Sequence, residues 1–197
     1  MNAAEALERL LTGNRRYAAT RQIHPRQTVV HRQTLVDGQN PFAAILSCSD
    51  SRVPSELIFD QGLGDLFIVR TAGHAVNELV LASLEYAVFA LRVPLIMVLG
   101  HGSCGAVLSV IASTAEGREL PGHLPYLVSC IQPTLKDVDL SAGDVVERSI
   151  RANSRRTREY LAANSPLLAQ AMRQQALEVV AAYYDLGSGR VELLDPA

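Results

Sequence analysis

Three short apolar runs, each leading through a polar or glycine-containing segment into a stretch of helical character, constrain the fold of this chain most strongly. The runs span residues 42–47, 65–71 and 95–100. Apolar runs of this length are typical of strands covered on both faces of a parallel sheet. Alternation of strands and helices supplies the covering layers. The sequence therefore predicts an α/β fold with a central, mostly parallel β-sheet and flanking helices.

The C-terminal part of the chain adds further helices and a hairpin. Residues 177–186 and 190–194 read as strands on either side of Gly187-Ser188-Gly189, which is typical of a β-hairpin. This hairpin would make the sheet mixed at its end. Helices are expected at residues 76–91, 105–116, 123–136, 143–163 and 166–174.

The N-terminal residues have a different character from the rest. Asn2 can cap a helix with an apolar face, after which residues 20–40 are polar and irregular. We interpret residues 1–40 as an N-terminal helical arm and residues 41–197 as the α/β core. No internal repeat or linker interrupts the chain, so one domain is the simplest organisation.

Composition excludes several classes of protein. The 197 residues are 48% hydrophobic and 19% charged, which is ordinary globular usage. A net charge of -2 gives no overall field for nucleic acid or for an anionic membrane surface. The run at residues 93–99 contains Pro94 and is far shorter than the ~20 residues that span a bilayer. The start shows no basic flank and apolar block of an export signal, so a cytoplasmic location is expected.

Two of the three cysteines fall where the predicted strands end. Cys48 closes the first strand, while His101 and Cys104 follow the third. The carboxyl ends of parallel strands meet at one edge of a sheet, where such folds place their sites. Two thiolates and an imidazole suit Zn²⁺ and leave a fourth position for water, as in catalytic zinc sites. The alternative is that the cysteines are small core residues and the histidine is buried and hydrogen-bonded.

The loop after Cys48 adds one acidic and one basic side chain. In an extended segment alternate residues point the same way, so Asp50 and Arg52 can pair beside a metal. An arginine keeps the carboxylate ionised, and that carboxylate can accept a proton from metal-bound water. The alternative for an Asp-x-Arg sequence by itself is a surface ion pair.

With these residues in view, the sequence resembles the β-class carbonic anhydrases. The resemblance rests on Cys48-Ser-Asp50-Ser-Arg52 and His101-Gly-Ser-Cys104-Gly105, and it extends through residues 39–41, 64–73, 85–88 and 184–191. It implies one zinc ion per chain, held by Cys48, His101 and Cys104, with Asp50 and Arg52 as a catalytic dyad. It also implies a substrate pocket lined by Gln39, Phe67, Ala72, Tyr86 and Gly105.

The activity that the resemblance implies is the reversible hydration of carbon dioxide to bicarbonate and a proton. Zinc-bound hydroxide, oriented by the Asp-Arg dyad, would attack CO₂. Two alternatives stay open. One is a carbon disulfide or carbonyl sulfide hydrolase on the same scaffold, and the other is a zinc-binding regulatory protein without turnover. Intact Asp50, Arg52 and Gln39 argue against the second.

Three positions depart from the pattern of the family or are not explained by it. Allosteric members carry a tryptophan where this chain has Ile45, and the chain has no tryptophan, so bicarbonate inhibition is not expected. His74 stands where many members have asparagine, and we favour a structural hydrogen bond over a proton relay there. Cys130 matches no ligand and is interpreted as a buried thiol.

The helix expected at residues 76–91 indicates an assembly. Between Leu79 and Leu91 only Ser83 and Glu85 are polar, so this helix should be covered on all sides. We expect a second subunit on the face that carries Leu81, Tyr86, Phe89 and Ala90. The resemblance implies a homodimer or a multiple of dimers, with Tyr86 lining a pocket whose zinc belongs in part to the neighbouring chain.

Overall fold

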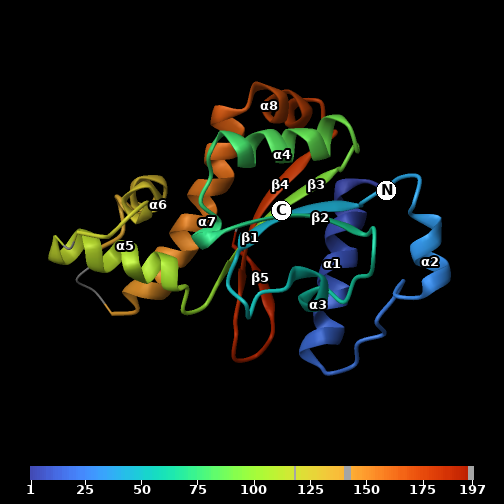
Figure 1. Ribbon diagram of the computed structural model, residues 1–197, viewed down its shortest axis with the longest axis horizontal. Coiled ribbons are helices and arrows are strands. Elements are labelled where there is room, and N and C mark those ends of the chain that lie inside the picture. The colour runs from blue at the N-terminus through green and yellow to red at the C-terminus, as the bar shows by residue number, and fades with distance from the viewer. Residues whose placement is uncertain (118, 140–142, 195–197) are drawn as a thin grey trace.

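The computed structural model describes residues 1–117, 119–139 and 143–194, and its centre is a five-stranded sheet (Figure 1). The strands are β1 (Ala43–Cys48), β2 (Leu66–Thr71), β3 (Leu95–His101), β4 (Glu178–Tyr184) and β5 (Val191–Leu193). Their order is β2-β1-β3-β4-β5, and all neighbours pair in parallel except β4 and β5. The predicted α/β class and the mixed end of the sheet are confirmed.

The helices follow the predicted order. They are α1 (Ala3–Ala18), α2 (Val29–Thr34), α3 (Ser55–Ile58), α4 (Glu78–Phe89), α5 (Gly105–Glu116), α6 (Leu124–Ile131), α7 (Val145–Asn164) and α8 (Pro166–Arg173), with short 3₁₀ turns η1 (Ala72–His74) and η2 (Gln132–Leu135). The expected helix at 123–136 is thus divided between α6 and η2. None of these described helices is both long and apolar enough to cross a membrane.

Helix α2 was not predicted, because its residues lack an apolar period. It buries none of its side chains. The helix begins instead at a local signal, the Thr28 hydroxyl, which accepts a hydrogen bond from the His31 amide at 3.1 Å. The arm expected to be irregular between α1 and β1 therefore contains one short, exposed helix.

Two helical layers cover the faces of the sheet (Figure 1). Helices α1 and α3 pack on one face, where Leu10 and Phe59 meet Ile45. Helices α4, α7 and α8 pack on the other, where Leu84 and Leu161 contact the opposite side chains of the same strands. Strands β1 and β3 are buried along their whole length, as the apolar runs predicted.

Helix α7 lies close against the carboxyl end of β3. A Cβ atom on Gly100 would lie 2.3 Å from Ser154 Oγ of α7, so only glycine fits at that position. The next residue along β3 is His101. The close approach therefore places α7 beside the edge of the sheet where the predicted site residues lie.

A buried carboxylate holds the N-terminal arm on the core. Asp60 accepts hydrogen bonds from Arg16 Nε at 2.6 Å and from the Ile23 and His24 amides at 3.1 and 3.0 Å. Burial by itself raises the pKa of Asp60, but the Arg16 guanidinium and the two amides together lower that pKa below its ordinary value. The division into an arm and a core stays a prediction.

Asp60→Asn is expected to lower the free energy of unfolding by about 2 kcal/mol at pH 7, because it removes a charge from these three bonds. A lowered pKa gives stability that is present above the ordinary aspartate pKa of about 3.9 and is lost as the pH falls through the folded-state value. The difference between wild type and variant should therefore shrink below about pH 4. Urea unfolding at several pH values measures it, and a difference that does not depend on pH would contradict this reading.

Candidate metal centre

Two cysteines and a histidine meet at the carboxyl edge of the sheet. Ser47 of β1 pairs with Leu99 of β3, so Cys48 and His101 end two neighbouring strands. Cys104 follows at the N-terminus of α5. All three side chains are buried, and their ligand atoms lie within 4.8 Å of one another. The structure thus brings together the three residues that the sequence singled out.

The spacing of the sulfur atoms fits a tetrahedral ion. Cys48 Sγ and Cys104 Sγ are 3.9 Å apart, and both cysteines are free thiols. Two sulfurs that each lie about 2.3 Å from one tetrahedral zinc ion would be roughly 3.8 Å apart. The pair is therefore already at the separation that shared coordination requires.

His101 offers an unused lone pair. Its Nδ1 lies 2.9 Å from the Gly102 carbonyl oxygen, which can only accept, so Nδ1 carries the proton. Nε2 is then an acceptor, and it is buried without a hydrogen-bond partner in the described part of the chain. A backbone carbonyl on the far nitrogen is the usual way in which proteins orient a metal-binding histidine. The three side chains therefore fit a soft divalent metal.

Cys48 lies among groups that stabilise its thiolate. The Cys104 thiol, with the amides of Asp50 at 3.4 Å and Gly73 at 3.2 Å, lowers the pKa of Cys48 well below its ordinary value against the effect of burial. The same contact with Cys48 raises the pKa of Cys104. Ionisation of Cys48 thus opposes ionisation of Cys104, and a dication between the sulfurs would favour both thiolates.

Asp50 and Arg52 form the predicted pair. Arg52 Nε and Nη2 donate to the two carboxylate oxygens of Asp50 at 2.9 and 2.8 Å, and the Arg52 amide donates to Oδ1 at 2.9 Å. These bonds hold the pKa of Asp50 well below its usual range. Asp50 Oδ2 lies 3.9 Å from His101 Nε2. An ionised acceptor therefore lies beside the cluster.

Arg70 supports this loop, and the sequence reasoning gave it no role. Its Nε donates to the Cys48 carbonyl at 2.9 Å and its Nη2 to the Asp50 carbonyl at 2.6 Å. The available signal was a single charged residue near the end of an otherwise apolar strand. Arg70 fixes the backbone from which both the Cys48 and the Asp50 side chains project.

His74 is held by a hydrogen bond, as we expected. It is 1% exposed, and its Nε2 lies 3.0 Å from Asn153 Nδ2. Burial lowers its pKa to about 4, so the ring is neutral at physiological pH. A neutral ring without access to solvent is poorly suited to carry protons. Asn153 was not singled out from the sequence.

The expected pocket residues divide into two groups. Ala72 and Gly105 adjoin the cluster, because Ala72 follows β2 where Thr71 pairs with Cys48, and Gly105 follows Cys104. Gln39 is exposed and precedes the amino end of β1, at the opposite edge of the sheet. One chain thus brings only part of the expected pocket to its own cluster.

Phe67 and Tyr86 form the second group and contact each other. Their ring centroids are 6.1 Å apart. Phe67 pairs with Ala44, four residues before Cys48, and a rise of about 3.3 Å per residue puts it roughly 13 Å from that end of the strand. These two rings therefore do not line the cluster of their own chain.

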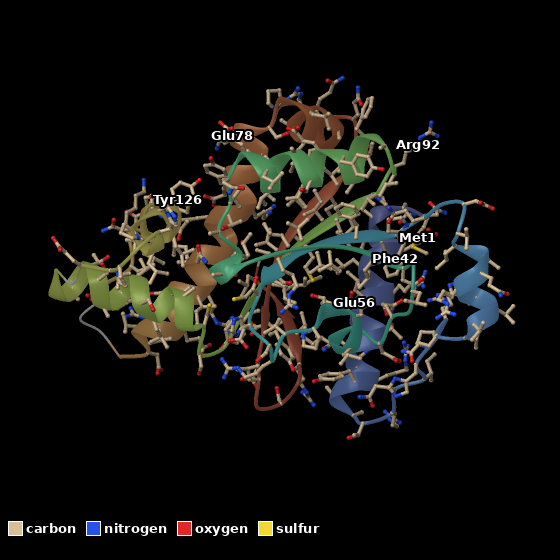
Figure 2. All side chains as sticks on the ribbon, in the orientation of Figure 1. Met1, Phe42, Glu56, Glu78, Arg92 and Tyr126 are labelled. Carbon is tan, nitrogen blue, oxygen red and sulfur yellow. The ribbon has the colours of Figure 1, made fainter. Side chains whose placement is uncertain are left out.

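Cys130 corrects one expectation. It is half-buried, not buried, because α6 turns Ile131 to the core and leaves Cys130 on its flank. Cys130 lines a cavity of about 570 Å³ between α4, α6 and α7. Figure 2 labels Glu78 and Tyr126, which line the same cavity from α4 and α6. Cys130 belongs to this cavity and not to the cluster.

The mostly parallel sheet and the buried Cys-His-Cys cluster define an α/β protein whose carboxyl edge carries a group of side chains that could hold a soft metal ion. Comparison with known proteins agrees. Residues 43–191 match the family model described as carbonic anhydrase. Carbonic anhydrase 2 of Mycobacterium tuberculosis is 43% identical, covering 98% of this chain and 94% of its own. The carbonic anhydrase of Mycolicibacterium smegmatis is 40% identical, covering 98% and 93%.

Solved structures show the same fold. A tetrameric β-carbonic anhydrase from Sordaria macrospora matches with a TM-score of 0.75 and 25% identity, over 98% of both chains. The β-carbonic anhydrase CafA of Aspergillus fumigatus matches with a TM-score of 0.73 and 29% identity, over 95% of this chain and 89% of its own. The chain belongs to the carbonic anhydrase family of enzymes, and its fold is that of the β class.

Proposed function

We propose that this chain catalyses the reversible hydration of carbon dioxide to bicarbonate and a proton, with one zinc ion per chain held by Cys48, His101 and Cys104. The observation that carries the proposal is the cluster of Cys48, His101 and Cys104, whose ligand atoms lie within 4.8 Å of one another, together with a His101 Nε2 that has no hydrogen-bond partner among the described residues and lies 3.9 Å from the ionised Asp50. Zinc bound by three protein ligands lowers the pKa of a water molecule and supplies a nucleophile near neutral pH. The family assignment supports this chemistry.

The residues around the cluster have separate tasks in this proposal. Arg52 donates to both carboxylate oxygens of Asp50. Oδ1 accepts two of these hydrogen bonds and Oδ2 accepts one, so Oδ2 keeps a lone pair for another donor. That oxygen accepts a hydrogen bond from the attacking water and so fixes the direction of its lone pair toward CO₂. Arg52 keeps Asp50 ionised throughout, and Arg70 holds the loop in place.

Turnover measured side by side with CO₂, carbonyl sulfide and carbon disulfide tests the choice of substrate. The proposal expects rapid hydration of CO₂ and much slower reaction of the two sulfur compounds. Equal or faster turnover of either one would favour the alternative hydrolase. A chain that binds zinc but turns over none of the three would favour the regulatory alternative.

We further propose a homodimer, or a multiple of dimers, built on the exposed face of α4. Leu79, Tyr86 and Phe89 are 74%, 51% and 77% exposed. Leu81 differs from these three, because it is half-buried and packs against the core cluster that contains Leu84, so only part of its side chain is open to a partner. An apolar face of this kind on a helix is typical of an interface.

Strand β2 supports the same surface. It is an edge strand of the described sheet, so the backbone groups on its outer side have no neighbouring strand to pair with. Its apolar side chains are only half-buried, and a second chain could cover both. Phe67 of β2 and Tyr86 of α4 contact each other and lie away from their own cluster. We propose that this pair, with Gln39, lines the pocket of a neighbouring chain. A cytoplasmic location agrees with free thiols as ligands, which a reducing compartment preserves.

Phe89→Glu is expected to convert the assembly to monomers and to remove most of the turnover, because a charge would be buried at the interface and Tyr86 would leave the neighbouring pocket. Sedimentation velocity and CO₂ hydration measure the two effects together. Leu124→Glu is the control, since Leu124 is also exposed and apolar but lies on α6. A fully active monomer of either the wild type or the Phe89 variant would contradict the shared pocket.

A further inference from the structure

A buried asparagine of α7 holds the backbone turn that follows β2. Asn153 is 1% exposed, and its Nδ2 lies 3.0 Å from the Gly73 carbonyl oxygen and 3.0 Å from His74 Nε2. Thr134 Oγ1 lies 2.8 Å from the other end of the amide, Asn153 Oδ1. The Gly73 carbonyl can only accept, so the amide nitrogen must face the turn. Both of its protons are then used on two consecutive residues.

The turn that Asn153 holds has an unusual backbone. Gly73 and His74 have φ angles of 59° and 45°, both in the left-handed region. His74 adopts this conformation at a cost, and such residues persist only where the surroundings hold them. Thr71 closes the turn from one side by donating to the Ala75 carbonyl at 2.7 Å. Asn153 closes it from the other.

The same turn contacts the cluster. The Gly73 amide donates to Cys48 Sγ at 3.2 Å, and the Asp50 amide is the second such donor, at 3.4 Å. Amide donors stabilise negative charge on a thiolate and fix its direction, as groups behind metal ligands generally do. The carbonyl and the amide of Gly73 belong to one residue, so the bond from Asn153 to the carbonyl restrains the position of the amide.

We propose that Asn153 is a positioning residue for the Cys48 ligand: through Gly73 and His74 it holds the Gly73 amide against Sγ and so raises the affinity of the site for zinc. The inference rests on the proposed function, because it requires that Cys48 bind the metal. In this proposal the buried His74 also has a role, because its Nε2 accepts the second hydrogen bond by which Asn153 of α7 holds the turn. Asn153 contacts no ligand atom itself, and its effect passes through the backbone.

A second buried asparagine provides a matched control. Asn14 is 3% exposed, and its Nδ2 donates to the Ile58 and Gly189 carbonyls at 3.2 and 2.9 Å. Its Oδ1 accepts from the Val191 amide at 2.8 Å. Asn14→Ala therefore removes as many hydrogen bonds as Asn153→Ala, but its partners are Gly189, Ile58 at the end of α3 and Val191 of β5, which are not among the groups bonded to Cys48.

The experiment compares wild type, Asn153→Ala and Asn14→Ala in two measurements. The first is the zinc dissociation constant, obtained by competition with a chromophoric chelator. Asn153→Ala should raise it by about tenfold to a hundredfold, the usual effect of losing support behind a metal ligand. The second is the thiolate-to-metal charge-transfer band of the cobalt-substituted protein. This band should move to longer wavelength, because the sulfur loses a hydrogen-bond donor. Asn14→Ala should leave both values unchanged while lowering the stability of the fold.

Equal zinc affinity and equal band position in the two alanine variants would overturn the inference. Should Asn153→Ala fail to fold, Asn153→Ser keeps the site polar with a side chain too short for both contacts, and the same two results decide. The proposed function is tested separately by the wild type. Wild type without stoichiometric zinc would overturn both proposals, whereas zinc-loaded wild type with an unaffected Asn153 variant overturns this inference alone.

Discussion

Serine at Cys48 or at Cys104 is expected to abolish stoichiometric zinc binding and, with it, the hydration of CO₂. Each change replaces a soft thiolate by a hydroxyl that stays protonated at neutral pH, so the metal loses one of three protein ligands. The remaining cysteine and His101 cannot hold zinc at the original affinity. Elemental analysis of the purified variants, together with stopped-flow hydration rates, measures both losses.

Cys130→Ser is the matched control for these variants. Cys130 is a free thiol on α6 that lines the cavity beside Tyr126 and lies outside the cluster. Its replacement should leave one zinc ion per chain and the full rate. Stoichiometric zinc in the Cys48 or Cys104 variant, or loss of zinc in the Cys130 variant, would contradict the assignment of ligands.

Asp50→Asn and Arg52→Ala should both fold and keep zinc yet lose on the order of a hundredfold or more in kcat, because they remove the proton acceptor and its support but no ligand. Asparagine keeps the shape of Asp50 but presents an amide where the carboxylate accepts. Arg52→Ala frees the carboxylate from the bonds that hold the pKa of Asp50 low. Steady-state kinetics with parallel zinc analysis separates lost turnover from lost metal.

Arg15→Ala provides a control for removing an arginine from an ion pair. Arg15 binds Glu8 on the exposed surface of α1, at 2.6 Å, far along the chain from the cluster. It should retain the wild-type rate, since exposed pairs contribute little. Near-wild-type kcat in both the Asp50 and the Arg52 variant would remove the dyad from the mechanism.

The sequence predicted the strands and the cluster because both depend on local rules. Apolar runs identify strands buried on both faces, and parallel pairing brings their carboxyl ends to one edge. Cys48 and His101 therefore had to lie close once β1 and β3 were neighbours, which the register confirms. Asp50 and Arg52 could be paired from their spacing alone, and the structure contains that pair.

Contacts between segments that lie far apart in the sequence could not be predicted from such local rules. Asn153 is separated from Gly73 and His74 by about half of the α/β core, and nothing in its own helix indicates that its amide faces them. Arg70 donates to the backbone carbonyls of Cys48 and Asp50. Every residue has such a carbonyl, so the sequence does not show which ones an arginine will bind. Leu81 was expected to face a partner and is instead half-buried against the core, because a largely apolar helix gives little sign of which face meets the core.

The most direct test of the central claim is stopped-flow CO₂ hydration by one preparation in three states: as purified, after removal of zinc by a chelator, and after zinc is added back. The account predicts a rate that falls with the zinc content to the uncatalysed level and returns in proportion, reaching its full value at one ion per chain. It also predicts that added zinc restores nothing to the Cys48→Ser variant treated in the same way. A metal-depleted protein that still hydrates CO₂ at the original rate would contradict the account.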